Sequence, residues 1–387
     1  MRPPGEGPAK SGLERFASNV NRSNNGAMNE KPEGPLRRGW TTGACATAAT
    51  RAAFTALLGG GFPDPVTITL PGGQRPAFAL AREVLESESA SAGIIKDAGD
   101  DPDVTHGALV LATLRRGPAA SGIVFRAGPG VGTVTRPGLA LAVGEPAITP
   151  VPRRMMRETV AEIAAEHGVP ADVEISLSIA DGEALANRTL NGRLGIVGGL
   201  SVLGTSGIVI PYSCAAWIAS IRQGVDVARA GSFDHVAAST GTTSEAAVKA
   251  HYGLDEAALI EMGDFAGGLL KYLRRNPVPL LTIAGGFGKL VKLGQGDLDL
   301  HSGRSQVDFE WLAGGLAELG AGADAVARAR SANTAAEVLE MARGQDLPLG
   351  DWVAARAGET ARQTAGDAVA IEILVYDRAG EPVGRDG

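Results

Sequence analysis

Short apolar runs separated by polar and Gly-rich breaks dominate the first half of the chain and predict strands. The runs span residues 66–70, 108–114, 122–126 and 173–179. Two helices are predicted among them, one from an N-cap at Thr42 to a stop at Gly59 and one from Pro152, near its start, to Gly168. Because few of these strands are separated by long helices, an α+β domain is expected over residues 36–190.

From about residue 191 onward the pattern changes to strands that alternate with helices. Strands are predicted over residues 235–238, 259–262, 278–283 and 368–376, with helical segments between them. One of these helices is expected to begin with a capping box in which Thr242 reaches Glu245. The alternation predicts an α/β domain over residues 191–387, built on a doubly wound, mostly parallel, Rossmann-like sheet.

Residues 1–35 differ from both predicted domains. They are rich in Gly, Pro, Ser and Asn and show no apolar periodicity, so we expect a disordered tail. The whole chain has 387 residues, of which 44% are hydrophobic, and this length favours two domains over one.

Composition narrows the classes of partner. The formal net charge is −7 and no long basic run occurs, which argues against a general nucleic-acid binder. No apolar stretch is long enough to span a membrane, and the N-terminus lacks the apolar core of a signal peptide. Two cysteines exclude a disulfide framework and a cysteine-based zinc site, and they fit a reducing cytoplasm.

Residues 96–107 form an acidic motif that contains four aspartates and His106. Carboxylates this close repel one another unless a cation, a hydrogen-bond network or water takes up the charge. The spacing does not match a calcium loop, and a solvated turn before the next strand is the simpler alternative. An imidazole can bind a metal such as cobalt, but a hydrogen-bonded structural histidine is the more common situation.

Four polar, Gly-containing loops follow predicted strands. In open α/β sheets, ligands bind beyond the carboxyl ends of the strands. Any one such loop is more often a tight turn, but the set predicts a cofactor crevice lined by Gly204, Thr205, Ser206, Gly241, Thr242, Asp264, Gly285 and Gly286. A dinucleotide fingerprint is absent, and Gly285 to Lys289 lacks the spacing and the hydroxyl residue of a Walker loop.

Several blocks together resemble one family, the cobalt-precorrin-5B (C1)-methyltransferases of cobalamin biosynthesis. They are GWTTGACA at residues 39–46, the acidic motif, the blocks at residues 130–139 and 144–148, and RLGIVGGLSVLGTSG at residues 193–207. The likeness runs from about Leu36 to beyond Gly288. It implies an S-adenosylmethionine-dependent enzyme that methylates C-1 of cobalt-precorrin-5B to give cobalt-precorrin-6A.

The implied substrate is a polycarboxylate, so an acidic protein needs local positive charge to hold it. Arginine binds carboxylates bidentately, and the candidate substrate contacts are Arg37, Arg38, Thr41, Thr42 and Lys289. The acidic motif would repel such a substrate but attract the cationic methyl donor. The candidate catalytic residues are therefore Asp100, Asp101 and His106.

Two other functions remain open at this point. One is a non-catalytic tetrapyrrole carrier, and the other is a nucleotide-dependent enzyme that uses the Gly-rich loops of the second half. No resident metal ion is expected.

Overall fold

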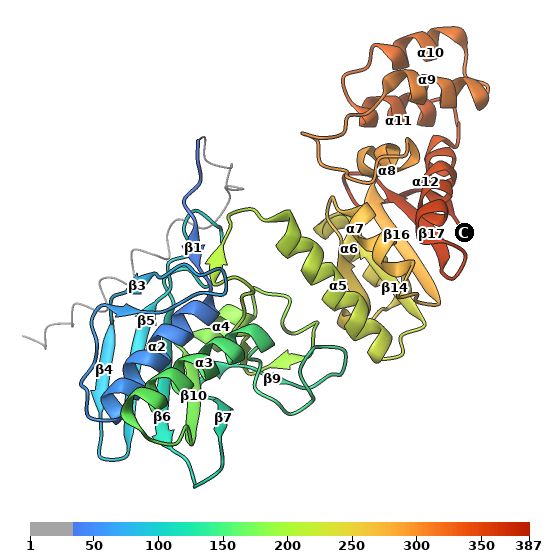
Figure 1. Cartoon of the computed structure of the whole chain (residues 1–387). Coiled ribbons are helices and arrows are strands. Elements are labelled where there is room, and N and C mark those ends of the chain that lie inside the picture. The colour runs from blue at the N-terminus through green and yellow to red at the C-terminus, as the bar shows by residue number, and fades with distance from the viewer. Residues whose placement is uncertain (1–33) are drawn as a thin grey trace, which may run out of the picture.

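The computed structural model describes residues 34–387 as two bodies of mixed α/β structure (Figure 1). The expected disordered tail, residues 1–35, lies almost entirely outside the described residues. None of the helices within residues 34–387 combines the length and the apolar character that crossing a bilayer requires.

The N-terminal body is built on a five-stranded sheet with the order β4-β5-β6-β10-β7. Neighbouring strands are antiparallel except β10 and β7, which are parallel. The strands are β4 (Arg82–Leu85), β5 (Ser89–Ile95), β6 (Leu109–Arg116), β7 (Ile123–Ala127) and β10 (Val173–Ile179). Helices α2 (Thr42–Leu57) and α3 (Pro150–His167) pack against each other and against this sheet.

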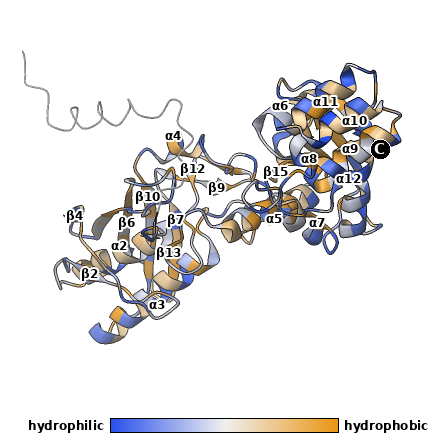
Figure 2. Cartoon of the chain, turned by 90° about the horizontal axis from the view of Figure 1, so that it is seen from above, coloured by the Kyte–Doolittle hydropathy of each residue, from blue (hydrophilic) through white to orange (hydrophobic). Residues whose placement is uncertain are grey.

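Helix α2 is rich in alanine, and its small side chains let it pack closely between the sheet and α3. Its residues from Thr42 to Thr50 are all buried. Helix α3 has polar residues on its outer side, and both helices show apolar and polar positions in Figure 2. The remaining short elements of this body are β2 (Val66–Thr67), β3 (Ala77–Phe78) and α4 (Gly182–Ala186).

Three pairs of two-residue strands tie residues 196–209 to the first half of the chain. Strand β1 (Gly39–Trp40) pairs with β13 (Ile208–Val209), β8 (Gly130–Val131) with β12 (Gly199–Leu200), and β9 (Thr133–Val134) with β11 (Ile196–Val197). These residues were expected in the second half, but their pairing partners all lie in the N-terminal body.

The C-terminal body contains a second five-stranded sheet, with the order β15-β14-β16-β17-β18. The first four strands are parallel, and β18 closes the edge in the antiparallel direction. The strands are β14 (His235–Ser239), β15 (Leu259–Glu261), β16 (Leu280–Gly286), β17 (Ala370–Tyr376) and β18 (Pro382–Asp386).

Helices cover both faces of this sheet. Alternate strand residues point to opposite sides, so Ala237, Leu259 and Ala284 meet Val248 of α6, whereas Val236 and Ile260 join the core under α5, α7 and α12. The helical elements are α5 (Cys214–Ala230), α6 (Thr242–Tyr252), η1 (Glu256–Ala258), α7 (Ala266–Leu273), α8 (Phe287–Gly294), α9 (Phe309–Glu318), α10 (Ala323–Arg330), α11 (Ala335–Arg343) and α12 (Leu349–Ala365).

The strand order creates a switch point beside β14. The chain passes from β14 to β15 on one side and then crosses to β16 on the other side of β14. The loops that follow β14 and β16 therefore diverge to opposite sides at the carboxyl edge, where α/β sheets bind ligands.

Two predicted helix starts differ from the structure. Helix α2 is capped by Thr41 rather than Thr42, because the Thr41 hydroxyl accepts the Ala44 N–H at 3.2 Å. The capping box of α6 is wrong: the N-cap is Gly241, which has no side chain to cap the helix, and Glu245 is instead bound by Arg193.

Candidate functional site

The carboxyl edge of the C-terminal sheet gathers six of the predicted site residues. Gly241 and Thr242 follow β14, Asp264 follows β15, and Gly285 and Gly286 end β16, while Lys289 lies in the first turn of α8. Parallel strands end at a common edge, so residues distant in the sequence become neighbours here. The loop after β14 also stays bonded to the neighbouring strand, because the Thr240 N–H donates to the Ala284 carbonyl of β16 at 3.0 Å.

Two helices begin at this edge without a side-chain cap. Gly241 is the N-cap of α6 and Gly286 that of α8, and neither position offers a side-chain acceptor. A Cβ atom built on Gly241 or Gly286 would meet nothing within 4 Å, so the backbone is open to a ligand at both places. The free N–H groups of a helix start favour negatively charged groups such as a carboxylate.

Lys289, a predicted substrate contact, is engaged by a protein carboxylate. Its ammonium pairs with Asp264, another predicted site residue, across the edge. Burial, together with the charge of Lys292, lowers the pKa of Lys289, while Asp299 opposes the shift. Lys289 is therefore paired with a carboxylate and is not a free cation.

Arg193 reaches this edge from the N-terminal body. Its guanidinium donates to both Glu245 carboxylate oxygens, at 2.8 and 2.6 Å, and its Nε lies 3.2 Å from Glu256. Glu245 also accepts the Ser239 hydroxyl at 3.2 Å, at the end of β14. Sequence reasoning missed this contact because Glu245 was interpreted as a helix-capping residue.

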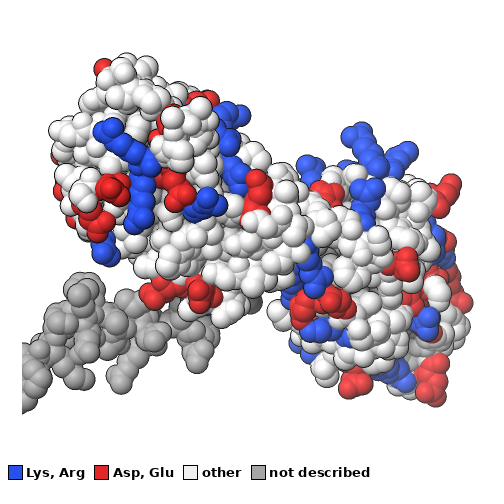
Figure 3. All heavy atoms as spheres, turned by 90° about the horizontal axis from the view of Figure 1, so that it is seen from below, with Lys and Arg blue, Asp and Glu red and all other residues white. Residues whose placement is uncertain are grey.

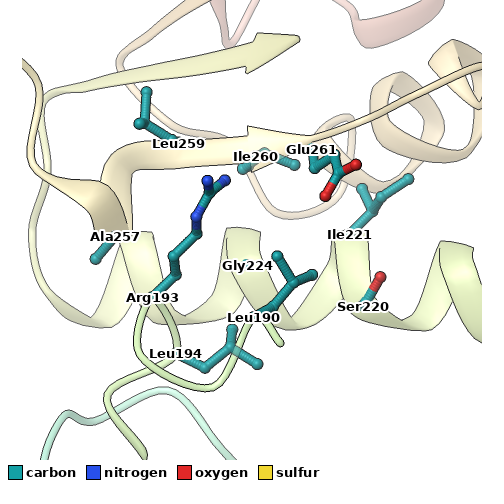
Figure 4. Close-up of a pocket in the computed structure, with 10 residues that line it drawn as sticks. All are labelled: Leu190, Arg193, Leu194, Ser220, Ile221, Gly224, Ala257, Leu259, Ile260 and Glu261. Carbon is teal, nitrogen blue, oxygen red and sulfur yellow. The ribbon is translucent and has the colours of Figure 1, made fainter. Parts of the chain in front are cut away.

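A small cavity of about 20 Å³ lies beside edge strand β15. Arg193 and Leu194 line it from the N-terminal body, facing Ser220 of α5 and Glu261 of β15 (Figure 4). Burial and the charge of Glu245 raise the pKa of Glu261, whereas Arg193 opposes the shift. The space suits one water molecule, so the cavity is part of the contact between the bodies and not a cofactor site.

The acidic motif lies in the N-terminal body, where Arg37 binds its first two aspartates. The Arg37 guanidinium donates to Asp97 at 2.5 and 2.9 Å, and the Arg37 backbone N–H donates to Asp100 at 2.6 Å. The Arg37 hydrogen bond lowers the pKa of Asp97 to about 2. Arg37 is thus not free to bind a substrate carboxylate, while Arg38 is exposed and forms no ion pair with any residue between 34 and 387.

A buried lysine organises the other end of the motif. Lys96 is 3% exposed, and its ammonium donates to Asp103 and to the Thr105 hydroxyl. Asp103 also accepts the Thr105 backbone N–H at 2.8 Å. Burial would raise the pKa of Asp103, but the charge and hydrogen bonds of Lys96 and Thr105 outweigh it and lower the pKa.

Asp101 connects the motif to the segment that leads into the C-terminal body. It accepts the Tyr212 N–H at 2.8 Å, two residues before α5, and burial raises its pKa. His106 accepts the Ala98 N–H through Nδ1 at 3.1 Å. Every aspartate of the motif therefore has a protein donor, and the catalytic role expected for Asp100, Asp101 and His106 stays a prediction.

The Arg37–Asp97 pair predicts an acid-sensitive contribution to stability. The pKa of Asp97 in the fold is about 2, below the value of about 3.9 for an unfolded chain. The contribution is therefore present above pH ~4 and is lost as the pH falls towards ~2. Urea unfolding at pH 7 and pH 3 should show a smaller acid-induced loss for Asp97→Asn than for the wild type. Equal losses in both proteins would contradict this role. Water screens this exposed ion pair, so its contribution to the free energy of unfolding is small.

Gly204, Thr205 and Ser206 do not join the edge of the C-terminal sheet. They lie in the N-terminal body, where Gly204 packs against Thr41 so closely that a Cβ atom would approach the Thr41 hydroxyl to 2.3 Å. Thr41 and Thr42 are buried at the start of α2. The predicted residues thus form two groups, one in each body.

Charges of both signs are interleaved over the two bodies on the face drawn in Figure 3. Many of the basic side chains form ion pairs, such as Arg136 with Asp255 at 3.2 Å and Arg153 with Glu145 at 3.2 Å. A polyanionic ligand would therefore be held by a few specific contacts rather than by a broad field.

Comparisons with known proteins agree with one another. Models of the CbiD family and of the CbiD C-terminal domain match residues 29–211 and 299–387. The chain is 62% identical over 353 residues, 91% of this chain and 98% of the relative, to the cobalt-precorrin-5B C(1)-methyltransferase of Paramagnetospirillum magneticum. It is 60% identical, over 93% of this chain and 100% of the relative, to the protein of that name from Rhodospirillum rubrum.

A solved structure, the cobalamin biosynthesis protein CbiD from Archaeoglobus fulgidus, is 26% identical and covers 70% of this chain and 84% of that chain, with a TM-score of 0.39. The identity to the two bacterial relatives extends over nearly their whole length. The chain is a member of the CbiD family.

Proposed function

We propose that this protein transfers a methyl group to C-1 of cobalt-precorrin-5B in cobalamin biosynthesis. The observation that carries the proposal is the 62% identity over 98% of a relative named for that activity. A chain this similar over 91% of its length is expected to keep the same loops at the same strand ends and the same site chemistry.

S-adenosylmethionine is the methyl donor in this proposal, bound at the carboxyl edge of the C-terminal sheet. The open backbone at Gly241 and Gly286 and the two uncapped helix starts support close approach of a ligand with a carboxylate. The donor would supply the methyl group on a sulfonium. The protein's part is to align donor and acceptor and to exclude water.

The two bodies correspond to two domains in this proposal. The N-terminal α+β domain would end near Pro211, where the first family model also ends. The C-terminal domain would be a Rossmann-like unit that starts with α5, because helices lie on both faces of its mostly parallel sheet. This division moves the expected boundary from residue 190 to the segment before α5.

The substrate would be held partly by the N-terminal body. Among the predicted substrate contacts, Arg38 is the exposed basic residue with no carboxylate partner between residues 34 and 387. Thr41 and Thr42 are both buried, so they would affect substrate binding by positioning the start of helix α2 and not by touching the substrate. The free cysteines, buried Cys45 and exposed Cys214, suit a reducing compartment such as the cytoplasm.

The two rival functions differ from this proposal in their ligands. A nucleotide-dependent enzyme would need Lys289 free for phosphate, but Asp264 neutralises it. Calorimetric titration with S-adenosylhomocysteine distinguishes the rivals, because a tetrapyrrole carrier or a kinase should not bind it saturably. Methyl transfer to cobalt-precorrin-5B from labelled S-adenosylmethionine tests the reaction itself.

Replacing Gly241 by valine should weaken S-adenosylhomocysteine binding about tenfold or more, a loss of at least ~1.4 kcal/mol. The backbone at Gly241 is extended, with φ 175° and ψ 171°, so valine causes no strain and its side chain enters the open crevice. The melting temperature should stay close to that of the wild type. Gly204→Val is a poorer probe, because its side chain would collide with Thr41.

Gly322→Val provides the matched control for Gly241→Val. Gly322 is likewise an N-cap without a side-chain cap and with no atom within 4 Å of a built Cβ, but it begins α10. Gly322→Val should leave both the affinity for S-adenosylhomocysteine and the melting temperature unchanged. Unchanged affinity in Gly241→Val would exclude the proposed donor site.

A further inference from the structure

Trp217 lies at the rim of the proposed donor crevice. Helix α5 packs beside β15, and its first turn lies at the end of that strand, on the carboxyl edge of the sheet. Trp217 is in that turn and is 42% exposed. A single exposed apolar residue is ordinary, but this one is fixed in place by contacts with the crevice loops.

The indole ring is held over the end of β15. Its Nε1 donates to the Glu261 carbonyl at 3.3 Å. Gly263 lies against the indole, since a Cβ atom built there would be 3.4 Å from the ring, and the Gly263 N–H donates to the Ser239 carbonyl at 3.0 Å. Trp217 is therefore connected through one glycine to the carboxyl end of β14.

The indole has no flat stacking partner within residues 34–387. The Phe265 ring lies 6.3 Å away at an interplanar angle of 43°, so the two rings do not cover each other's faces. The Arg304 guanidinium lies 6.0 Å from the centre of Phe265 and supports that ring instead. A planar group can therefore lie against the exposed part of the indole.

The surroundings of Trp217 suit a nucleoside. In α/β sheets that bind adenosine-containing cofactors, a carboxylate near the end of a neighbouring strand hydrogen-bonds the ribose. Asp264 lies three residues beyond the end of β15, next to Gly263, and its carboxylate is held by Lys289. The start of α8 at Gly286 lies across β14 from this strand, where the carboxylate end of a donor would be placed.

We propose that Trp217 stacks against the adenine ring of the methyl donor, on the β15 side of the crevice, with the amino-acid part directed towards Gly286. This assignment rests on the function proposed above. Base–aromatic stacking contributes enough that removing the ring should weaken binding about fivefold or more.

Tryptophan fluorescence and calorimetry with the full-length protein test the assignment. S-adenosylhomocysteine and adenosine should each quench the fluorescence, and homocysteine should not. Trp217→Leu should weaken the binding of S-adenosylhomocysteine and adenosine about fivefold or more, whereas Trp217→Phe should retain most of the affinity. Both variants lose the Nε1 hydrogen bond, so their difference isolates the aromatic ring.

Trp311→Phe is the control, because the Trp311 ring packs against the Trp352 ring, with the two ring centroids 4.4 Å apart, and lies away from the crevice loops. It should keep both the quenching and the affinity, whereas Trp217→Phe should lose most of the quenching. Wild-type S-adenosylhomocysteine affinity in Trp217→Leu would overturn the stacking role, as would weaker precorrin binding with donor binding intact. Failure of the wild type itself to bind S-adenosylhomocysteine would refute the proposed function instead.

Discussion

Replacing Asp103 by alanine is expected to lower the free energy of unfolding by about 3–5 kcal/mol, the cost of leaving a buried charge without its partner. Lys96 is 3% exposed, and its ammonium would keep only the Thr105 hydroxyl as a bonded neighbour. Thr105 would also lose the carboxylate that accepts its backbone N–H at 2.8 Å. Urea unfolding at neutral pH measures the change.

Two variants control this experiment. Asp100 is exposed and accepts one backbone N–H from Arg37, so Asp100→Ala should cost under about 1 kcal/mol. The double variant Lys96→Met with Asp103→Leu removes both charges and should recover most of the loss. If Asp103→Ala unfolds like the wild type, the acidic motif does not stabilise the N-terminal body in this way.

Replacing Arg193 by methionine is expected to destabilise the protein by about 1.5–3 kcal/mol, the range for hydrogen bonds to charged groups. The Arg193 and Glu245 side chains are only 25% and 15% exposed, whereas Glu256 would keep Lys249 as its partner. Because Glu245 lies in the first turn of α6, which follows Gly241, the variant should also weaken S-adenosylhomocysteine binding. A double-mutant cycle with Glu245→Gln isolates the coupling of the pair.

Arg136→Met is the matched control, since Arg136 also joins the two bodies. Its partner is Asp255 at 3.2 Å, and the two side chains are 39% and 47% exposed, so water screens the pair. Arg136→Met should lower the free energy of unfolding by at most about 1 kcal/mol. Equal effects of the two variants would mean that Arg193 stabilises only the contact between the bodies and not the proposed donor site.

Long regular elements could be predicted from the sequence, and short paired ones could not. Apolar runs predicted β10 and β17 closely, and Gly168 ends α3 as expected. Strand β5 was missed because small residues give it little apolar periodicity. Strands β11 to β13 have two residues each, too few to show an alternation of apolar and polar positions. Only their partners in the N-terminal body fix where they lie.

The candidate site could be predicted at the level of loops but not of individual partners. Gly241 and Gly286 lie at the carboxyl edge because strands that alternate with helices run parallel and end at a common edge. The aspartates were recognised as a cluster, but their donors are distant in sequence: Arg37 is 60 residues from Asp97 and Tyr212 is 111 residues from Asp101. Such pairs have no local signal.

The pairing of β1 with β13 has a consequence for how the protein is made. Gly39 pairs with Val209, so strand β1 can form its pairing with β13 only after 170 further residues have been made. During translation, more than half of the 387 residues must leave the ribosome before this body can close. Nascent chains stopped before residue 208 should remain open to proteolysis, and the C-terminal body can begin to fold only after its neighbour has received its last strand.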